Sequence, residues 1–400
     1  MNDSALLANY NRAPINIVRG EGCYLYDDQG QRYLDFIAGI AVCALGHCHP
    51  WISQAIADQA RTLVHCSNLY YHEPAGALAK ELVARSGFAR AFFCNSGTEA
   101  NEAAIKLARK RAFRKGETDR VTILACTGSF HGRTLGALAA TANDKYKEGF
   151  GPMPAGFAFT EFNDMFALDK AIDDKVAAFI VEPVQGESGV HPASVEFLAM
   201  ARHLCDKRGA LLIFDEIQCG MGRLGPLFAF QRFGVTPDVV TMAKALANGL
   251  PIGAMLVAES AIDALQPGDH GTTFGGSPVP CAAALAHLRV RDAIDLAAYV
   301  AVREVQLMAR LADLALAFPS IISGLRGMGL LCALGLNEKY PVADVVTALR
   351  EHGMLVGSAG GNSLRFAPPL VLGEEQIDEA YETLYEVFSH IDERVSAVVA

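Results

Sequence analysis

The sequence predicts an α/β protein with a mostly parallel central sheet and a second, smaller α+β domain. The chain has 400 residues, of which 51% are hydrophobic and 20% charged, and this composition suits a large folded core rather than a disordered chain. From about residue 88 to residue 275, short β-branched apolar runs alternate with longer helical patterns, which is typical of a parallel sheet covered by helices. After about residue 320 the pattern changes to glycine-rich strands followed by helices.

The alternating region contains clear start and stop signals for its helices. Phe92-Phe93-Cys94 reads as a strand, and the helix after it is opened by Ser96-Gly97-Thr98-Glu99, a Ser-x-x-Glu capping box, and closed at Gly116. A second helix is expected over 194–208, with Gly209 as its stop signal. The further buried strands are expected at 121–126, 177–181, 210–214, 239–242 and 252–258.

The C-terminal part predicts strands over 321–336, a helix near 342–352, a strand at 364–366 and a last amphipathic helix. That helix carries one apolar stripe at 4,3,4,3 spacing, which we interpret as core packing: Ile377, Tyr381, Leu384, Phe388 and Ile391. We therefore expect residues 51–280 to form the large domain, and residues 1–50 together with 281–400 to form the small one.

Charge and composition exclude several classes of partner and location. The formal charge of −10 gives no basic field for nucleic acid or an anionic membrane. No apolar run reaches the roughly 18 residues that span a bilayer, and residues 1–4 show no secretory signal. The ten cysteines include no Cys-x-x-Cys pair and are interpreted as reduced thiols, so we expect a cytoplasmic protein.

Two nucleotide-binding patterns are rejected. Residues 220–225 match G-x-G-x-x-G, but five residues that include Asp215 and Glu216 separate this run from the preceding strand, and no convincing helix follows it. No G-x-x-x-x-G-K-[ST] sequence occurs.

An acid and an amine at strand ends carry the strongest chemical signal. Asp215 and Lys244 each follow a buried strand, at the carboxyl edge where ligands of open α/β sheets bind. A lysine at such a strand end is partly desolvated, so its pKa falls and it can form a Schiff base. An aspartate beside it can pair with a pyridinium nitrogen. Taken singly, each residue could instead be a turn cap or a surface charge.

A phosphate cradle favours the chemical interpretation. Ser96-Gly97-Thr98 lies at a strand-to-helix junction, where free N–H groups and hydroxyls converge on an anion. A second hydroxyl–glycine run over 270–276 could complete it. Phe130 offers a ring for stacking, and Arg133 offers a guanidinium for a carboxylate. Together these residues describe a pyridoxal phosphate site.

On these residues the chain resembles the class III aminotransferases of the fold-type I pyridoxal phosphate superfamily, and within them the acetylornithine aminotransferase branch. The motifs that carry the resemblance span nearly the whole chain: 39–42 with Gly46-His47, 93–102, 129–134, 182–187, 215–218, 243–246, 272–276 and 364–369. The resemblance makes the large domain the cofactor-binding one. It also implies a homodimer with shared active sites.

The resemblance implies a role for each matching residue. Lys244 would form the Schiff base and move the proton, while the other cofactor contacts would come from Ser96, Gly97, Thr98, Phe130, Asp215 and Gln218, with Thr273 supplied by the other subunit. No metal ligand is expected among these site residues. Cys219 follows Gln218 directly, which predicts a thiol near the pocket.

The resemblance also implies how substrates are bound. Arg133 would hold the distal carboxylate, Arg365 the α-carboxylate of glutamate, and Glu187 would neutralise Arg365 when that carboxylate is absent. By the same resemblance, the family's free-ornithine enzymes have a tyrosine at the position of Ile40. An aliphatic residue at this position leaves more room and favours an acylated donor. The expected reaction moves the δ-amino group of N2-acetylornithine to 2-oxoglutarate, giving N-acetylglutamate 5-semialdehyde and glutamate in arginine biosynthesis.

Other donors stay open on the sequence alone. They are succinylornithine, N-succinyl-diaminopimelate, ornithine and 4-aminobutyrate. A non-enzymatic scaffold is the alternative from another class, and the presence of both Lys244 and Asp215 argues against it.

Overall fold

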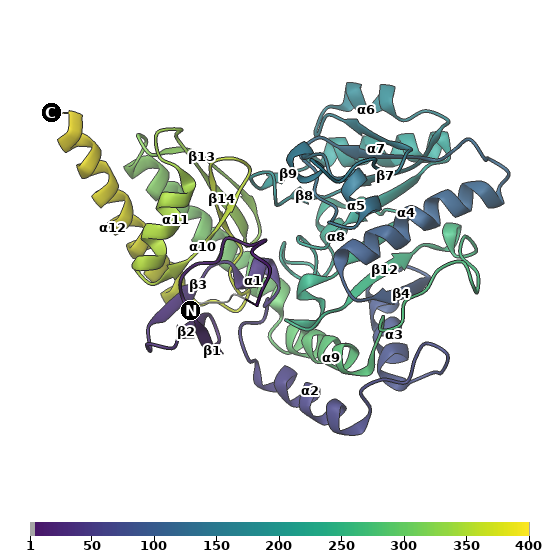
Figure 1. Ribbon diagram of the computed structural model, residues 1–400, viewed down its shortest axis with the longest axis horizontal. Coiled ribbons are helices and arrows are strands. Elements are labelled where there is room, and N and C mark those ends of the chain that lie inside the picture. Colours follow the sequence, from purple (N-terminus) through teal and green to yellow (C-terminus); the bar gives the residue numbers. More distant parts are fainter. Residues whose placement is uncertain (1–4, 400) are drawn as a thin grey trace.

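The computed structural model describes residues 5–399 and forms two lobes (Figure 1). Residues 1–4, where the sequence predicts no secretory signal, lie outside the described part. The larger lobe contains a seven-stranded sheet whose strands, in order across it, are β4 (Arg90–Cys94), β12 (Gly253–Val257), β11 (Val239–Met242), β10 (Leu211–Asp215), β7 (Val176–Val181), β5 (Thr122–Cys126) and β6 (Phe157–Thr160). The prediction of a mostly parallel sheet is confirmed, since only β12 runs antiparallel to its two neighbours.

Strand register brings the two predicted chemical positions to one edge. Asp215 is the last residue of β10, and it pairs in parallel register with Thr241 of β11. Lys244 follows β11 after one intervening residue and begins the short 3-10 helix η2 (Lys244–Ala247). Because parallel strands present their carboxyl ends at the same edge, both side chains start from the rim of the sheet.

The helices begin and end largely where the sequence signals them. Ser96 caps α4 by accepting the Glu99 N–H, and Gly209 ends α7 in the left-handed conformation. The capping box differs from the prediction in one partner, because the Glu99 carboxylate accepts from the backbone N–H of Asn95 at 2.6 Å. The helices are α1 (Ala38–Ala41), α2 (Pro50–Thr62), α3 (Glu73–Ser86), α4 (Gly97–Arg114), α5 (Leu135–Ala140), α6 (Met165–Ala171), α7 (Val195–Arg208), α8 (Ala229–Phe233), α9 (Pro278–Ala293), α10 (Leu296–Ala317), α11 (Val342–Glu351) and α12 (Glu374–Val399).

The smaller lobe contains two four-stranded sheets. One is antiparallel throughout, in the order β13 (Ile322–Met328), β14 (Leu331–Leu336), β17 (Ser363–Phe366) and β16 (Gly357–Ala359). The other joins β1 (Ile17–Glu21), β2 (Tyr24–Asp27), β3 (Arg32–Asp35) and β15 (Met354–Leu355). Since β15 pairs with β3, the two ends of the chain share one sheet. The exact domain boundaries near residues 50 and 280 stay predictions.

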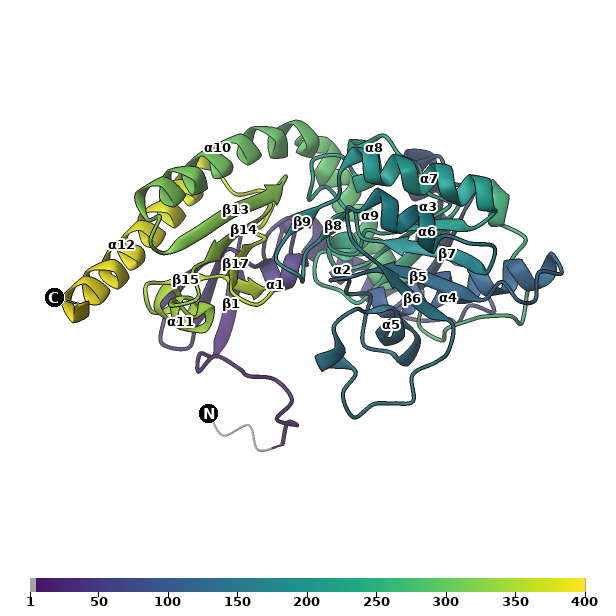
Figure 2. The ribbon, with the colours of Figure 1, turned by 90° about the horizontal axis from the view of Figure 1, so that it is seen from above.

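The apolar stripe of the last helix packs inward, as the sequence predicts. Ile377, Leu384 and Phe388 are buried, and Tyr381 and Ile391 pack against the same core from half-buried positions. Figure 2 shows α10 and α12 side by side along the outside of the smaller lobe. Along residues 5–399, no helix combines the length and apolarity needed to cross a membrane.

Candidate active site

A cavity of about 400 Å³ opens at the carboxyl edge of the large sheet and collects most of the predicted site residues. Its wall includes Ser96, Gly97, Thr98, Phe130, Arg133, Glu187, Asp215, Gln218 and Lys244. Apolar side chains that include Val42, Val184 and Ile252 line the same cavity. Polar groups with defined partners therefore meet in a partly apolar space, which is typical of a small-molecule site.

Lys244 lies in the wall with its amine in a low-dielectric environment. Its φ of +42° is in the left-handed region, which is costly for a residue other than glycine and is typical of functional positions. Burial is the main cause that lowers the pKa of Lys244, and Glu187 opposes it only in part. A lysine of lowered pKa supplies more of the neutral amine, which is the nucleophilic form.

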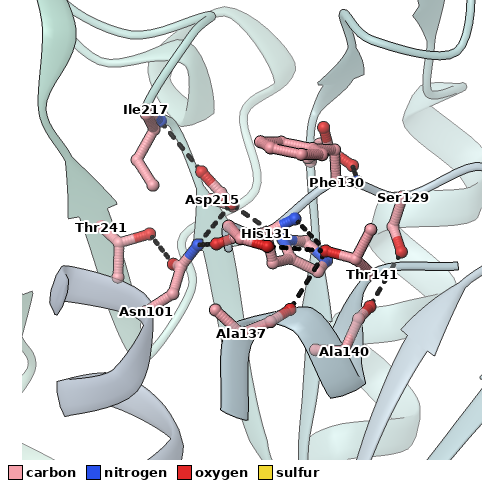
Figure 3. Close-up of polar contacts among 12 residues, drawn as sticks. Asn101, Ser129, Phe130, His131, Ala137, Ala140, Thr141, Asp215, Ile217 and Thr241 are labelled. Carbon is pink, nitrogen blue, oxygen red and sulfur yellow. Dashed lines mark hydrogen bonds and ion pairs between the residues drawn. The ribbon is translucent and has the colours of Figure 1, made fainter. Parts of the chain in front are cut away.

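Asp215 is held by a buried hydrogen-bond network (Figure 3). Its Oδ2 atom accepts from Asn101 Nδ2 at 2.8 Å and lies 2.8 Å from His131 Nδ1. Thr241 in turn donates to the Asn101 side-chain oxygen at 2.7 Å, which fixes the orientation of the amide. These contacts stabilise a carboxylate charge at the bottom of the cavity and keep it from turning.

Glu182 places a second, buried acid near this carboxylate. Burial, followed by the neighbouring Asp215 charge, raises the pKa of Glu182 well above its usual range. Its Oε2 atom accepts the backbone N–H of Phe130 at 3.1 Å. Burial therefore favours the protonated form of Glu182, and its hydrogen bond helps to fix the segment that carries the Phe130 ring.

The start of α4 provides an anion site. Ser96 Oγ accepts the Glu99 N–H, and the first-turn residues Gly97 and Thr98 line the cavity. N–H groups of a first helical turn have no intrahelical acceptor, so those of Gly97 and Thr98 can bind an anion. The approach is close, since a Cβ at Gly132 would lie 2.2 Å from the Thr98 hydroxyl. The absence of a side chain at Gly132 therefore allows the Thr98 hydroxyl to stay at the anion site.

The buried Arg365 forms an ion pair with Glu187, a half-buried residue of the cavity wall. Arg365 Nη1 donates to Glu187 Oε1 at 2.5 Å, and Gln218 Nε2 donates to the same oxygen at 2.9 Å. Burial tends to raise the pKa of Glu187, but Arg365 and Lys244 outweigh it and the net pKa is lowered. The Arg365 guanidinium is only slightly exposed, so it needs a carboxylate partner at all times.

The second arginine of the cavity is exposed and rests on an aromatic ring. The Arg133 guanidinium carbon lies 3.7 Å from the centroid of the Tyr146 ring and 5.6 Å from that of Phe130. The two rings pack edge to face at 6.0 Å. Within the described part of the chain, no Asp or Glu carboxylate forms an ion pair with Arg133, so its guanidinium is available to an anionic ligand.

Besides Arg365, three predicted residues do not line the cavity of this chain. Ile40 is 45% exposed and has a φ of +67°, and it does not line the cavity, although Val42 does. Thr273 lines a separate surface depression together with residues 67–69. Cys219 is buried outside the cavity lining, and burial raises the pKa of its thiol well above the usual range, so it is an inert packing group.

The residues present fit pyridoxal phosphate. A helix N-terminus with a hydroxyl can take the phosphate, Phe130 can take a ring face, and Asp215 lies buried where a protonated ring nitrogen would need a carboxylate. Lys244 supplies the amine for the aldehyde carbon. Each chemical part of the cofactor has a matching group in one cavity.

The sequence pattern does not indicate the groups that support the site. Asn101, His131 and Glu182 all lie inside the quoted motifs, but nothing in the local pattern assigns them a partner. Tyr146 lies in no motif at all, and only the fold brings it to Arg133. A polar residue inside a motif at a strand end is expected to be buried and hydrogen-bonded, and this was the one local signal that could have pointed to these supporting groups.

Comparison with known proteins agrees with this geometry. Residues 6–388 match the model of the family described as aminotransferase class III. The acetylornithine aminotransferase of Methanocaldococcus jannaschii is 47% identical over 96% of this chain and 95% of that protein. A crystal structure of ornithine aminotransferase from Toxoplasma gondii superposes with a TM-score of 0.95 at 34% identity, covering 98% of this chain and 94% of that one. For N-acetylornithine aminotransferase from Stenotrophomonas maltophilia the TM-score is 0.85 at 36% identity, covering 98% and 100%.

Proposed function

This chain belongs to the class III aminotransferases, and on that premise we propose that it moves the δ-amino group of N2-acetylornithine to 2-oxoglutarate. The products are N-acetylglutamate 5-semialdehyde and glutamate, and the reaction is a step of arginine biosynthesis. The chain is a transaminase that depends on pyridoxal phosphate.

The pair formed by Arg365 and Glu187 carries the proposal. Acetylornithine presents one carboxylate far from its reacting amine, whereas glutamate presents carboxylates at both ends. A site for both needs one permanent cation and one cation that can be neutralised. Arg133 has the exposure of the first, and Arg365, bonded to Glu187 at 2.5 Å, has the arrangement of the second.

Pyridoxal phosphate, when bound, supplies an aldehyde that exchanges for an amine and a ring that accepts electrons. Lys244 Nζ would hold the cofactor through its aldehyde, and the free amine of Lys244 would accept a proton from the substrate carbon and return it. The lowered pKa of Lys244 suits this exchange, because the neutral amine accepts a proton and the ammonium returns it.

The remaining residues bind and orient. Asp215, supported by His131 and Asn101, would pair with a protonated ring nitrogen. Gly97 and Thr98 would bind the phosphate at the start of α4. Ser96 orders that first turn through its cap, and Phe130 would offer its ring face to the cofactor ring.

Substrate carboxylates exchange partners without leaving a bare buried charge. When glutamate binds, its α-carboxylate replaces Glu187 as the partner of Arg365, and Glu187 turns away. When acetylornithine binds, Glu187 stays on Arg365, and Gln218 donates to the same Glu187 oxygen and holds it there. We also assign Gln218 to the cofactor ring hydroxyl, since its side chain lines the cavity.

The choice of donor rests mainly on the named relatives, several of which are acetylornithine aminotransferases. The aliphatic Ile40 supports an acylated donor only through the family resemblance, because Ile40 does not line the cavity of its own chain. The structural likeness to ornithine aminotransferase at a TM-score of 0.95 keeps ornithine as the second candidate. Succinylornithine, N-succinyl-diaminopimelate and 4-aminobutyrate are the other candidate donors and are tested beside acetylornithine and ornithine.

We further propose a cytoplasmic homodimer in which Thr273 completes the partner's phosphate site. Thr273 lies outside the cavity of its own chain, beside Asn68, whose amide donates to the Thr272 and Gly275 carbonyls. Large apolar side chains are exposed on these two adjoining segments: Leu69, Tyr70, Tyr71 and Phe274. A patch of this kind is typical of a subunit interface, and the free thiols suit a reducing compartment.

A single-turnover measurement tests the donor assignment. Holoenzyme is mixed separately with N-acetylornithine, N-succinylornithine, N-succinyl-diaminopimelate, ornithine and 4-aminobutyrate, and the absorbance of the cofactor is followed as its aldehyde form converts to the amine form. The fastest conversion per unit concentration is expected with N-acetylornithine. A faster reaction with another donor would overturn the substrate assignment and leave the family assignment intact.

A further inference from the structure

Three side chains with metal-ligating atoms meet on the outside of the smaller lobe, away from the cavity. They are His352, Glu386 and His390, and one ligand atom from each lies within 4.8 Å of the others. All three side chains are exposed, and none of them lines the active-site cavity. The mechanism proposed above assigns them no role.

Two separate elements supply the cluster. His352 is the C-cap residue of α11, and Glu386 and His390 both belong to α12, which lies against it (Figure 1). The ring centroids of His352 and His390 are 6.1 Å apart. Because Glu386 and His390 are four residues apart on a helix, their side chains project from the same face, one turn from each other.

The hydrogen bonding of His352 directs a free nitrogen outward. Its Nδ1 atom lies 2.8 Å from the backbone carbonyl oxygen of Ala348, and a carbonyl oxygen only accepts. Nδ1 therefore carries the hydrogen and donates it, which leaves the Nε2 lone pair available. In metal-binding histidines, one ring N–H commonly donates to a backbone carbonyl, and this bond leaves the other ring nitrogen unprotonated and able to bind the metal.

The distances suit a small divalent transition metal. Tetrahedral Zn²⁺ with bonds of about 2.0 to 2.2 Å brings its ligand atoms to roughly 3.4 Å from one another. The ligand atoms now lie within 4.8 Å of one another, so binding requires the exposed side chains of Glu386 and His390 to draw closer to His352. Two imidazoles and one carboxylate are a ligand set that zinc accepts, with water as the fourth ligand.

We propose that His352, Glu386 and His390 form a surface site for Zn²⁺ that links the C-terminal helix α12 to the end of α11. A metal bound to both elements joins residues 34 to 38 positions apart in sequence and so opposes separation of the last helix from the lobe. The site is independent of transamination, since its residues do not touch the cavity.

Calorimetric titration of the holoenzyme with zinc chloride tests the site. The wild-type protein is compared with His352→Ala, Glu386→Gln and His390→Ala, and with His203→Ala as a matched control, because His203 is an exposed histidine on α7 outside the cluster. Each cluster variant is expected to lose one equivalent of zinc or to bind it at least about tenfold more weakly. The His203→Ala protein is expected to bind zinc as the wild type does.

Thermal unfolding supplies a second readout. Zinc at a hundredfold excess over Kd is expected to raise the Tm of the wild type and of the His203→Ala protein by about 3 °C, and to leave the three cluster variants unshifted. Zinc binding with equal stoichiometry and affinity in all five proteins would overturn the proposal, as would no binding by the wild type. Turnover of the variants is expected to be unchanged, so failure of this site would leave the transaminase assignment untouched.

Discussion

Replacing Glu187 by glutamine should change the balance between the two half-reactions of the enzyme. The substitution keeps the shape of the side chain and removes its charge, so Arg365 loses the carboxylate that lies 2.5 Å from it. Acetylornithine brings no replacement carboxylate to Arg365, whereas glutamate does. The acetylornithine half-reaction should therefore become slower relative to the glutamate half-reaction.

The size of the effect follows from the kind of hydrogen bond that is exchanged. A bond to a charged partner contributes about 1.5 to 3 kcal/mol, and a neutral one about 0.5 to 1.5 kcal/mol, so the substitution costs roughly 1 to 2 kcal/mol. At about 1.4 kcal/mol per factor of ten, the ratio of the two rate constants should shift by about 5- to 30-fold towards glutamate. Arg365→Ala should shift it in the opposite direction by roughly 10- to 150-fold, because it removes the charged partner of the glutamate α-carboxylate.

Rapid-mixing absorbance gives both ratios directly. The aldehyde form of the holoenzyme is mixed with acetylornithine or with glutamate, and kmax and the half-saturation concentration are measured for each protein. Bound cofactor is quantified first, so that lost occupancy is separated from lost reactivity. Losses of equal size in both half-reactions, in either variant, would refute the exchange of partners at Arg365.

Three further predictions concern the cofactor and the stability of the fold. Lys244→Ala should keep the circular dichroism spectrum of the wild type and lose turnover by roughly 10²- to 10⁴-fold, because the proton-transferring amine is gone. Gly132→Ala should weaken cofactor binding at least about tenfold, measured by equilibrium dialysis, since its Cβ would lie 2.2 Å from the Thr98 hydroxyl. Burial tends to lower the pKa of His47, but the hydrogen bond to Asp35 at 2.7 Å outweighs it and raises that pKa from 6.5 to about 10. The folded state therefore binds the proton more tightly than the unfolded state. This stabilisation by His47 is complete below pH 6.5 and is lost as the pH rises through 10. The difference in free energy of unfolding between the wild type and His47→Gln should therefore shrink between pH 6.5 and pH 10.

Each of these predictions has a control or a contradicting result. Gly116→Ala matches the glycine substitution, because Gly116 also has a positive φ and a Cβ there meets nothing within 4 Å; equal loss of cofactor in both would point to backbone strain. Substantial turnover by Lys244→Ala would mean that another lysine performs the chemistry. A stability difference for His47→Gln that stays constant from pH 6.5 to pH 10 would contradict the assigned pKa.

Local signals predicted the elements well because helix and strand patterns depend on neighbours in sequence. Ser96 and Gly209 begin and end helices as expected, since capping involves residues three or four positions away. The partner of Glu99 was wrong, because its carboxylate reaches the Asn95 N–H and that choice depends on the path of the preceding strand.

The amino-acid sequence was enough to predict the family, the cofactor and the strand-end positions of Asp215 and Lys244, because these follow from motifs and from the periodicity of buried strands. The supporting groups became visible in the fold alone: His131 and Asn101 beside Asp215, and Tyr146 beside Arg133. The physical reason is that such contacts join segments far apart in the chain, so their partners are selected by the packing of whole elements rather than by local propensity.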